Sequence, residues 1–240
     1  MKKIICCLPL FLFAFLSHAQ GLEKIIVEKY YVSDANNITD DSFPKGSVTY
    51  RIYVDMKPDY TMQAVYGVPK HELHIATTTE FFNNKRLGEK TGDLIDDKKI
   101  NENTVALDSW LTMGAATKSH FGILKSDDKD GSIILRDSLA KADGLMAGKI
   151  PPVTIFGLDM RFFYDANNAS LFSTNNGSIA IFGGVKGPTV DNRVLIAQLT
   201  TNGKLSFELN IQIGTPTGDT EQYVAKNPEG AEIKFDGLTF

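Results

Sequence analysis

The chain has 240 residues, and its 25 basic and 29 acidic side chains give a formal net charge of −4 at pH 7. This balance argues against nucleic acid as a partner, because nucleic-acid-binding domains carry a basic stripe or patch. A chain of this length can bury a sizeable core and is ordinary for one large all-β domain.

The first 19 residues have the pattern of a secretory signal peptide. Lys2 and Lys3 form a positive start, residues 4–16 are apolar, and Ser17-His18-Ala19 precedes the expected cleavage before Gln20. The apolar run is too short for a transmembrane helix, which needs about 20 residues, and no later segment approaches one. We therefore expect a signal peptide at 1–19 and a secreted domain at 20–240, located in the periplasm, at the cell surface or in the medium.

Both cysteines, Cys6 and Cys7, lie in the expected leader. The mature chain would then contain no disulfide, thiol nucleophile or cysteine metal site. It would carry 23 basic and 29 acidic side chains, a net charge of −6, because Lys2 and Lys3 are the only charged residues removed. Its stability must come from core burial, alone or with a bound metal.

Alternation with a period of two dominates the mature chain and predicts strands. Within residues 47–56, apolar side chains alternate with a second face made of Ser47, Thr49, Arg51, Tyr53 and Asp55. Residues 60–68 repeat the pattern after Lys57-Pro58-Asp59. This short, turn-prone connector predicts that the two strands form a hairpin.

The clearest alternation covers residues 205–213, which predicts one buried and one solvated face. Asn202-Gly203 precedes it and predicts a tight hairpin turn with positive φ angles. The preceding residues 194–199 are apolar on both faces, as in a central strand.

The remaining elements complete an all-β assignment. A short helix is expected at 137–146, capped by Asp137 or Ser138. Many strands with little helix predict a single large antiparallel β-sandwich. Further strands are predicted at residues 23–32, 72–78, 104–113, 119–124, 153–163 and 231–235.

The stretch SDDKDGSIILRD, residues 126–137, resembles a twelve-residue calcium loop. Gly131 falls at the sharp turn of that template, but a serine replaces its leading aspartate, an aspartate replaces its final glutamate, and the flanks resemble strands. An acidic surface turn is the alternative. The candidate calcium ligands are Ser126, Asp128, Asp130, Ser132 and Asp137.

Two other motifs give weaker indications of metal binding. Residues 33–42 form an oxygen-rich loop, but the apolar Ile38 stands at a position where a calcium ligand would be expected. We therefore expect a solvated loop there. HELH, residues 71–74, spaces its histidines by three, whereas the zinc-protease motif requires four on a helix. In a strand, His71 and His74 would point to opposite faces and could not share one ion.

No catalytic constellation stands out in the sequence. Asp108-Ser109-Trp110 contains triad-like residue types, but adjacent residues in a strand point apart, and no G-x-S-x-G motif is present. Carboxylate pairs for glycoside hydrolysis are too numerous for sequence to select one. Trp110, the lone tryptophan, is more typical of a core position than of a sugar-stacking one.

Three stretches, GSVTYRIYVDM…MQAVYG, ALDSWLTMGAAT and NRVLIAQLTTNGKLSFELNIQ, resemble uncharacterised secreted β-rich proteins of Bacteroidota. The resemblance implies export, but no reaction, cofactor or catalytic residue.

The first hypothesis is a non-catalytic secreted β-sandwich that binds an extracellular ligand or envelope protein, or serves structurally at the envelope. A secreted hydrolase of polysaccharide or peptide is the alternative. The alternating strands and the C-terminal phenylalanine also allow an outer-membrane β-barrel.

Overall fold

The computed structural model describes residues 20–33, 43–102, 104–129, 143–163 and 169–240. Within them strands are the main regular structure, accompanied by the short 3-10 turns η1 (Gly92–Leu94), η2 (Val105–Leu107), η3 (Met160–Phe163) and η4 (Asp236–Leu238). The all-β prediction is confirmed. The strands are β1 (Leu22–Val32), β2 (Val48–Met56), β3 (Thr61–Gly67), β4 (Leu73–Thr77), β5 (Trp110–Leu111), β6 (His120–Gly122), β7 (Leu145–Ala147), β8 (Thr154–Phe156), β9 (Leu171–Thr174), β10 (Gly177–Val185), β11 (Arg193–Thr201), β12 (Leu205–Glu208), β13 (Asn210–Gly214), β14 (Thr220–Val224) and β15 (Ile233–Lys234).

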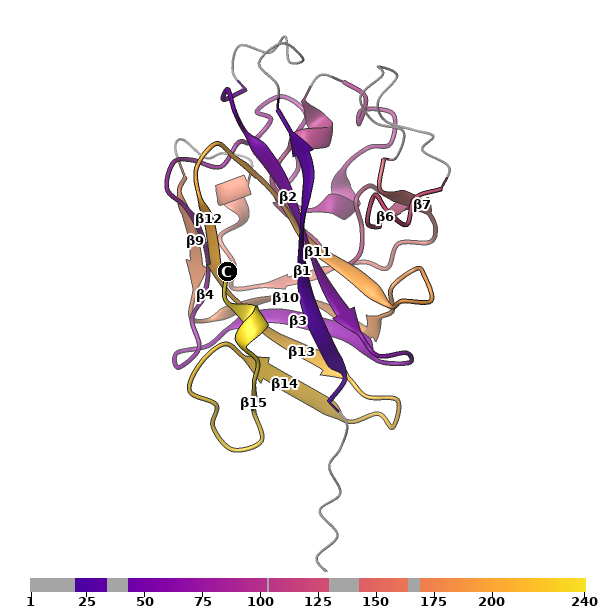
Figure 1. Cartoon of the computed structure of the whole chain (residues 1–240), viewed down its shortest axis with the longest axis vertical. Helices are drawn as coiled ribbons and strands as arrows, with labels where there is room; N and C mark the ends of the chain where they lie inside the picture. The colour runs from indigo at the N-terminus through magenta and orange to yellow at the C-terminus, as the bar shows by residue number, and fades with distance from the viewer. Residues whose placement is uncertain (1–19, 34–42, 103, 130–142, 164–168) are drawn as a thin grey trace, which may run out of the picture.

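The strands form a sandwich of open sheets. A four-stranded sheet has the order β1-β2-β11-β5, and a six-stranded sheet has the order β15-β14-β13-β3-β10-β8. A three-stranded sheet, β12-β4-β9, and the pair β6-β7 complete the described strands. Figure 1 shows β1 and β2 crossing β3, β10 and β13 steeply in that view. Pairing among the named strands of the described residues is antiparallel except between β14 and β15.

The main core lies between the four-stranded sheet on one side and the six-stranded and three-stranded sheets on the other. Ile52 and Val54 of β2 pack in one cluster with Ile179 of β10 and Ile211 of β13, all four fully buried. At about 25 cal/mol per Å² of apolar surface removed from water, such burial is the main stabilising term in a fold of this kind.

The second face of β2 is buried as well. Thr49, Arg51, Tyr53 and Asp55 are all at most 3% exposed, although their pattern resembles the polar side of a half-buried strand. The segment between β4 and β8 covers them and contributes a second apolar cluster around Trp110. This cover positions the candidate site described below.

Two predicted hairpins are wrong, because the chain changes sheet at each turn. β2 pairs with β1 and β11, whereas β3 pairs with β10 and β13. Likewise β11 lies in the four-stranded sheet, whereas β12 pairs with β4. Neither Asn202 nor Gly203 has a positive φ angle, so the expected hairpin turn does not form there.

Strand predictions were accurate where alternation was strict and long. β1 and β4 occupy nearly the predicted ranges, and the apolar alternation of 205–213 is buried as expected, although it divides between β12 and β13. The range 104–113 instead forms η2 and the two-residue β5, and 153–163 forms β8 and η3. The predicted helix at 137–146 lies mainly outside the described residues, and its last two residues belong to β7.

No strand was expected at β7, β9, β10 or β14. Within the described residues, no helix is both long and apolar enough to cross a membrane.

Candidate functional site

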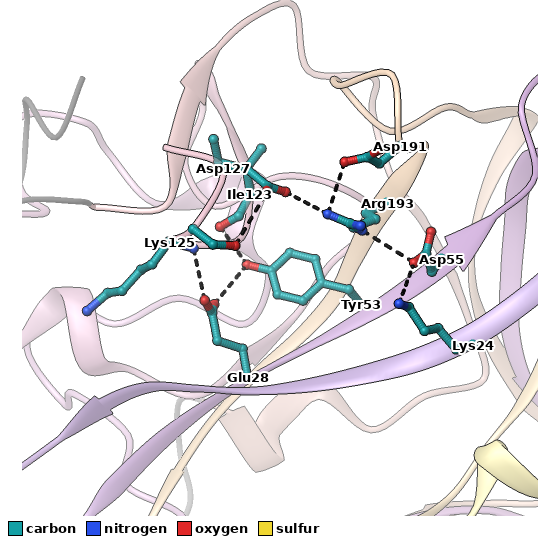
Figure 2. A network of polar contacts seen from close by, with 10 residues as sticks. Lys24, Glu28, Tyr53, Asp55, Ile123, Lys125, Asp127, Asp191 and Arg193 are labelled. Atoms are coloured by element: carbon teal, nitrogen blue, oxygen red, sulfur yellow. Dashed lines mark hydrogen bonds and ion pairs between the residues drawn. The ribbon is translucent and has the colours of Figure 1, made fainter. Parts of the chain in front are cut away.

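The most distinctive feature of the molecule is a polar network between the outer face of the four-stranded sheet and residues 123–128. Figure 2 shows Tyr53 pointing from β2 toward this segment, where its hydroxyl donates to the carbonyl of Ile123 at 2.8 Å. Glu28 of β1 accepts the backbone N–H of Lys125 at 2.9 Å. Two adjacent strands therefore bind the main chain of the same segment.

Arg193, at the start of β11, is the centre of the second half of the network (Figure 2). Its Nη1 lies 2.9 Å from Asp127 and 3.1 Å from Asp191, and its Nε lies 3.3 Å from Asp55. Lys24 lies 3.5 Å from the same oxygen of Asp55. The nearly buried Asp55 is thus balanced by two cations, and Asp127 is held to the sheet.

Arg51 crosses the same interface deeper inside. Its Nε donates to Gln198 Oε1 at 2.9 Å, and its Nη1 donates to the carbonyl of Gly144 at 2.8 Å. The guanidinium lies 3.7 Å from the centre of the Tyr30 ring, and the Tyr30 hydroxyl donates to the carbonyl of Asp143. Burial raises the pKa of Tyr30 against the opposing effect of Arg51, so the hydroxyl stays a donor.

Asp128, a candidate calcium ligand, is engaged by backbone. Its Oδ2 accepts N–H groups of Asp143, Gly144 and Leu145 at 2.9, 2.8 and 3.4 Å. A carboxylate that accepts several amides acts as a clamp, here between residue 128 and the start of β7.

The other candidate calcium ligands are not brought together by the described residues. The Ser126 hydroxyl donates to Asp127, while Asp130, Ser132 and Asp137 lie outside the described residues, as does most of the 33–42 loop. Elsewhere, no group of three or more His, Cys, Asp or Glu side chains in the described ranges is placed to hold a metal ion.

The three residues of Asp108-Ser109-Trp110 have separate structural roles. The buried Asp108 accepts the N–H groups of Asn84 and Glu89 at 2.7 and 2.9 Å. Burial raises the pKa of Asp108 well above its ordinary value, although these hydrogen bonds oppose the shift. Ser109 donates to the Phe82 carbonyl at 2.6 Å, and Trp110 is 2% exposed, as expected for a core residue.

A histidine–carboxylate pair lies on the covering segment. His120 Nδ1 is 2.7 Å from Asp97 Oδ1, and the hydroxyls of Thr117 and Ser119 lie 3.1 and 3.2 Å from the same nitrogen. Burial raises the pKa of Asp97, but the hydrogen bonds from Thr117, His120 and Ser119 outweigh it and lower the pKa overall. A serine triad needs carboxylate and hydroxyl on opposite ring nitrogens, which is not the arrangement here.

The HELH histidines have different partners, and only His74 lies in a strand. His71 precedes β4, and its Nε2 lies 2.9 Å from Glu232 Oε2, whereas His74 lies within β4 opposite Glu208 and Ser173. Sequence gave no signal for the partnership of His71 with Glu232, because the two are distant in the chain.

A shallow pocket of about 380 Å³ lies beside β9 and η3. Its apolar surface includes Phe162 and Phe172, and its rim carries Asp159 and Arg161, which pair through two contacts of 2.8 and 2.5 Å. Because the two charges of the rim neutralise each other, the pocket offers an apolar surface more than a reactive group.

Comparison with protein-family models, with curated proteins and with solved structures gave no match to this chain.

Proposed function

We propose that the chain is an exported, non-catalytic β-sandwich protein that binds an extracellular ligand or envelope protein, or serves structurally at the envelope. The leader would be residues 1–19 and the mature protein residues 20–240. The observation that carries this proposal is the use of buried and half-buried carboxylates as main-chain clamps. Glu28, Asp108 and Asp128 each accept backbone amides, a role that rigidifies loops and leaves their oxygens engaged.

An exposed aromatic pair supports a binding role. Phe182 on β10 is 82% exposed and Phe156 on the edge strand β8 is 49% exposed, with ring centres 6.4 Å apart. Exposed apolar side chains that cluster mark interaction surfaces more often than isolated ones do.

A binding and turnover comparison tests the proposal. Purified chain 20–240 is applied to a glycan array and incubated with a panel of envelope polysaccharides and peptides. We expect saturable binding without product, and Phe182→Ser should weaken that binding. Val190→Ser is the matched control, because Val190 is 92% exposed but makes no ring pair. Product formation that scales with enzyme concentration would contradict the proposal.

We also propose that calcium stabilises the segment 126–137. Calorimetric titration of chelator-treated protein with calcium up to millimolar concentration is the direct test. Asp128→Ala would disturb the clamp whether or not calcium binds, so Asp130→Ala and Asp137→Ala are the informative variants. Absence of heat, or unchanged binding in those two variants, would eliminate the calcium site.

A secreted hydrolase is the second candidate, and the Asp97–His120 pair favours it. A carboxylate on Nδ1 orients an imidazole whose other nitrogen can act as a general base. If the panel above yields product, His120→Gln should abolish turnover, whereas Ser206→Ala on the exposed face of β12 should leave it unchanged. Full turnover in His120→Gln would exclude this pair as the catalytic centre.

A further inference from the structure

The beginning of β1 is enclosed by residues from distant parts of the chain. The Gly21 N–H lies 2.9 Å from Glu221 Oε2 and 2.9 Å from the Tyr223 hydroxyl, and the Leu22 N–H lies 3.2 Å from that hydroxyl. The Gly21 carbonyl accepts the Lys57 N–H at 2.8 Å. Tyr223 itself is fully buried and donates to Glu221 at 2.5 Å.

Only glycine fits at position 21. A Cβ there would lie 2.1 Å from two carbons of the Tyr60 ring, a distance that no side chain can occupy without displacing the ring. Gly21 and Leu22 are buried, whereas Gln20 is exposed. The expected cleavage position therefore lies directly before an exposed residue that is followed by two buried ones.

Cleavage before Gln20 would convert an uncharged amide nitrogen into an α-ammonium. Backbone nitrogens of neighbouring residues are at most about 3.7 Å apart. Because Gly21 N is 2.9 Å from Glu221 Oε2, the new ammonium would lie within about 7 Å of that carboxylate. The nearest other cation on β1, Lys24, is paired with Asp55.

We propose that Glu221 and Tyr223 form a receptor for the mature N-terminus, so that removal of the leader places a positive charge near Glu221 and stabilises the sandwich. This inference rests on the export proposed above. The α-ammonium has an ordinary pKa of about 7.7–8.0, and the nearby carboxylate raises that pKa in the folded state. The stabilisation is therefore complete below about pH 7.7 and is lost as pH rises through the raised value.

The test compares two N-termini in chain 20–240. Both carry Gln20→Ala, which prevents the side-chain amide from cyclising onto the amine. One keeps the free amine and the other is N-acetylated. At pH 6.5 we expect the free amine to raise the melting temperature by about 1–3 °C, the size of one exposed ion pair in a protein of this length. The difference should vanish at pH 9.5.

Glu221→Gln is made in both the free-amine and the N-acetylated chain. It removes the negative charge at position 221, while its amide oxygen can still accept the Gly21 N–H. The free amine should give no advantage in this variant. Equal melting temperatures at pH 6.5, or an advantage that survives Glu221→Gln, would overturn the receptor. N-terminal sequencing of the exported protein separates the two proposals, since a start other than residue 20 contradicts the leader assignment but leaves the thermal comparison valid.

Discussion

At the scale of single residues, the aspartates of this protein differ in which groups contact their carboxylate oxygens. Asp128 looked like a calcium ligand by spacing, and in the structure it holds three backbone amides at the start of β7. Asp127, its neighbour, is bound to Arg193. Spacing could identify an acidic turn, but only the fold determines whether its oxygens face amides, a cation or solvent.

Asp128→Ala should lower the free energy of unfolding by about 2–3 kcal/mol, because three N–H groups lose one charged acceptor. Ser126→Ala is the control, since its exposed hydroxyl donates to Asp127 alone among the described residues and its loss should change stability by less than about 0.5 kcal/mol. Urea denaturation measures both. Equal, small effects in the two variants would show that the clamp contributes nothing.

Asp97 should make the protein sensitive to acid. Its pKa is lowered in the folded state, so its stabilising contribution is present above the ordinary value near 3.8 and is lost as pH falls through the lower folded value. The difference in unfolding free energy between wild type and Asp97→Asn should therefore be constant above about pH 5 and shrink below pH 4. A difference that stays constant down to pH 2 would contradict this assignment.

At the scale of elements, the sequence predicts strands better than it predicts their partners. Alternation identified β2, β3 and the 205–213 stretch because a period of two is a local property. Turn residues indicate that the chain reverses, but not whether the next strand stays in the same sheet. Both expected hairpins instead connect different sheets, a choice determined by contacts far away in the chain.

Asn192 ties the β2–β3 turn to the connection between β10 and β11. Its Nδ2 donates to the carbonyls of Lys57 and Tyr60 on the β2–β3 turn, and its Oδ1 accepts the Gly187 N–H after β10. Its φ angle is +52°, a conformation that Asn and Asp tolerate better than most residues.

Asn192→Asp should cost about 2–4 kcal/mol of stability, because the two donors are replaced by acceptors facing carbonyl groups. Asn227→Asp is the matched control, with a φ angle of +49° at an exposed position. Thermal unfolding of both variants provides the comparison. A loss as large in Asn227→Asp would assign the effect to backbone conformation instead.

At the scale of the whole molecule, the protein is a sandwich with an additional cover on one outer face. The polar alternation of Thr49, Arg51, Tyr53 and Asp55 gave no warning of this cover, since the segment that buries them begins more than 20 residues later. Arg51 and Tyr53 reach main-chain carbonyls of the cover, so these polar side chains function as attachment points.

Cysteine accessibility is the most direct measurement of this two-sided burial, because chain 20–240 contains no natural cysteine. Thr49 is completely buried under the cover, whereas Ser206 on β12 is exposed. In native protein we predict that Thr49→Cys reacts with a thiol reagent at least about 100-fold more slowly than Ser206→Cys, and equally fast in denaturant. Similar native rates for the two variants, with both folded by circular dichroism, would contradict a covered outer face.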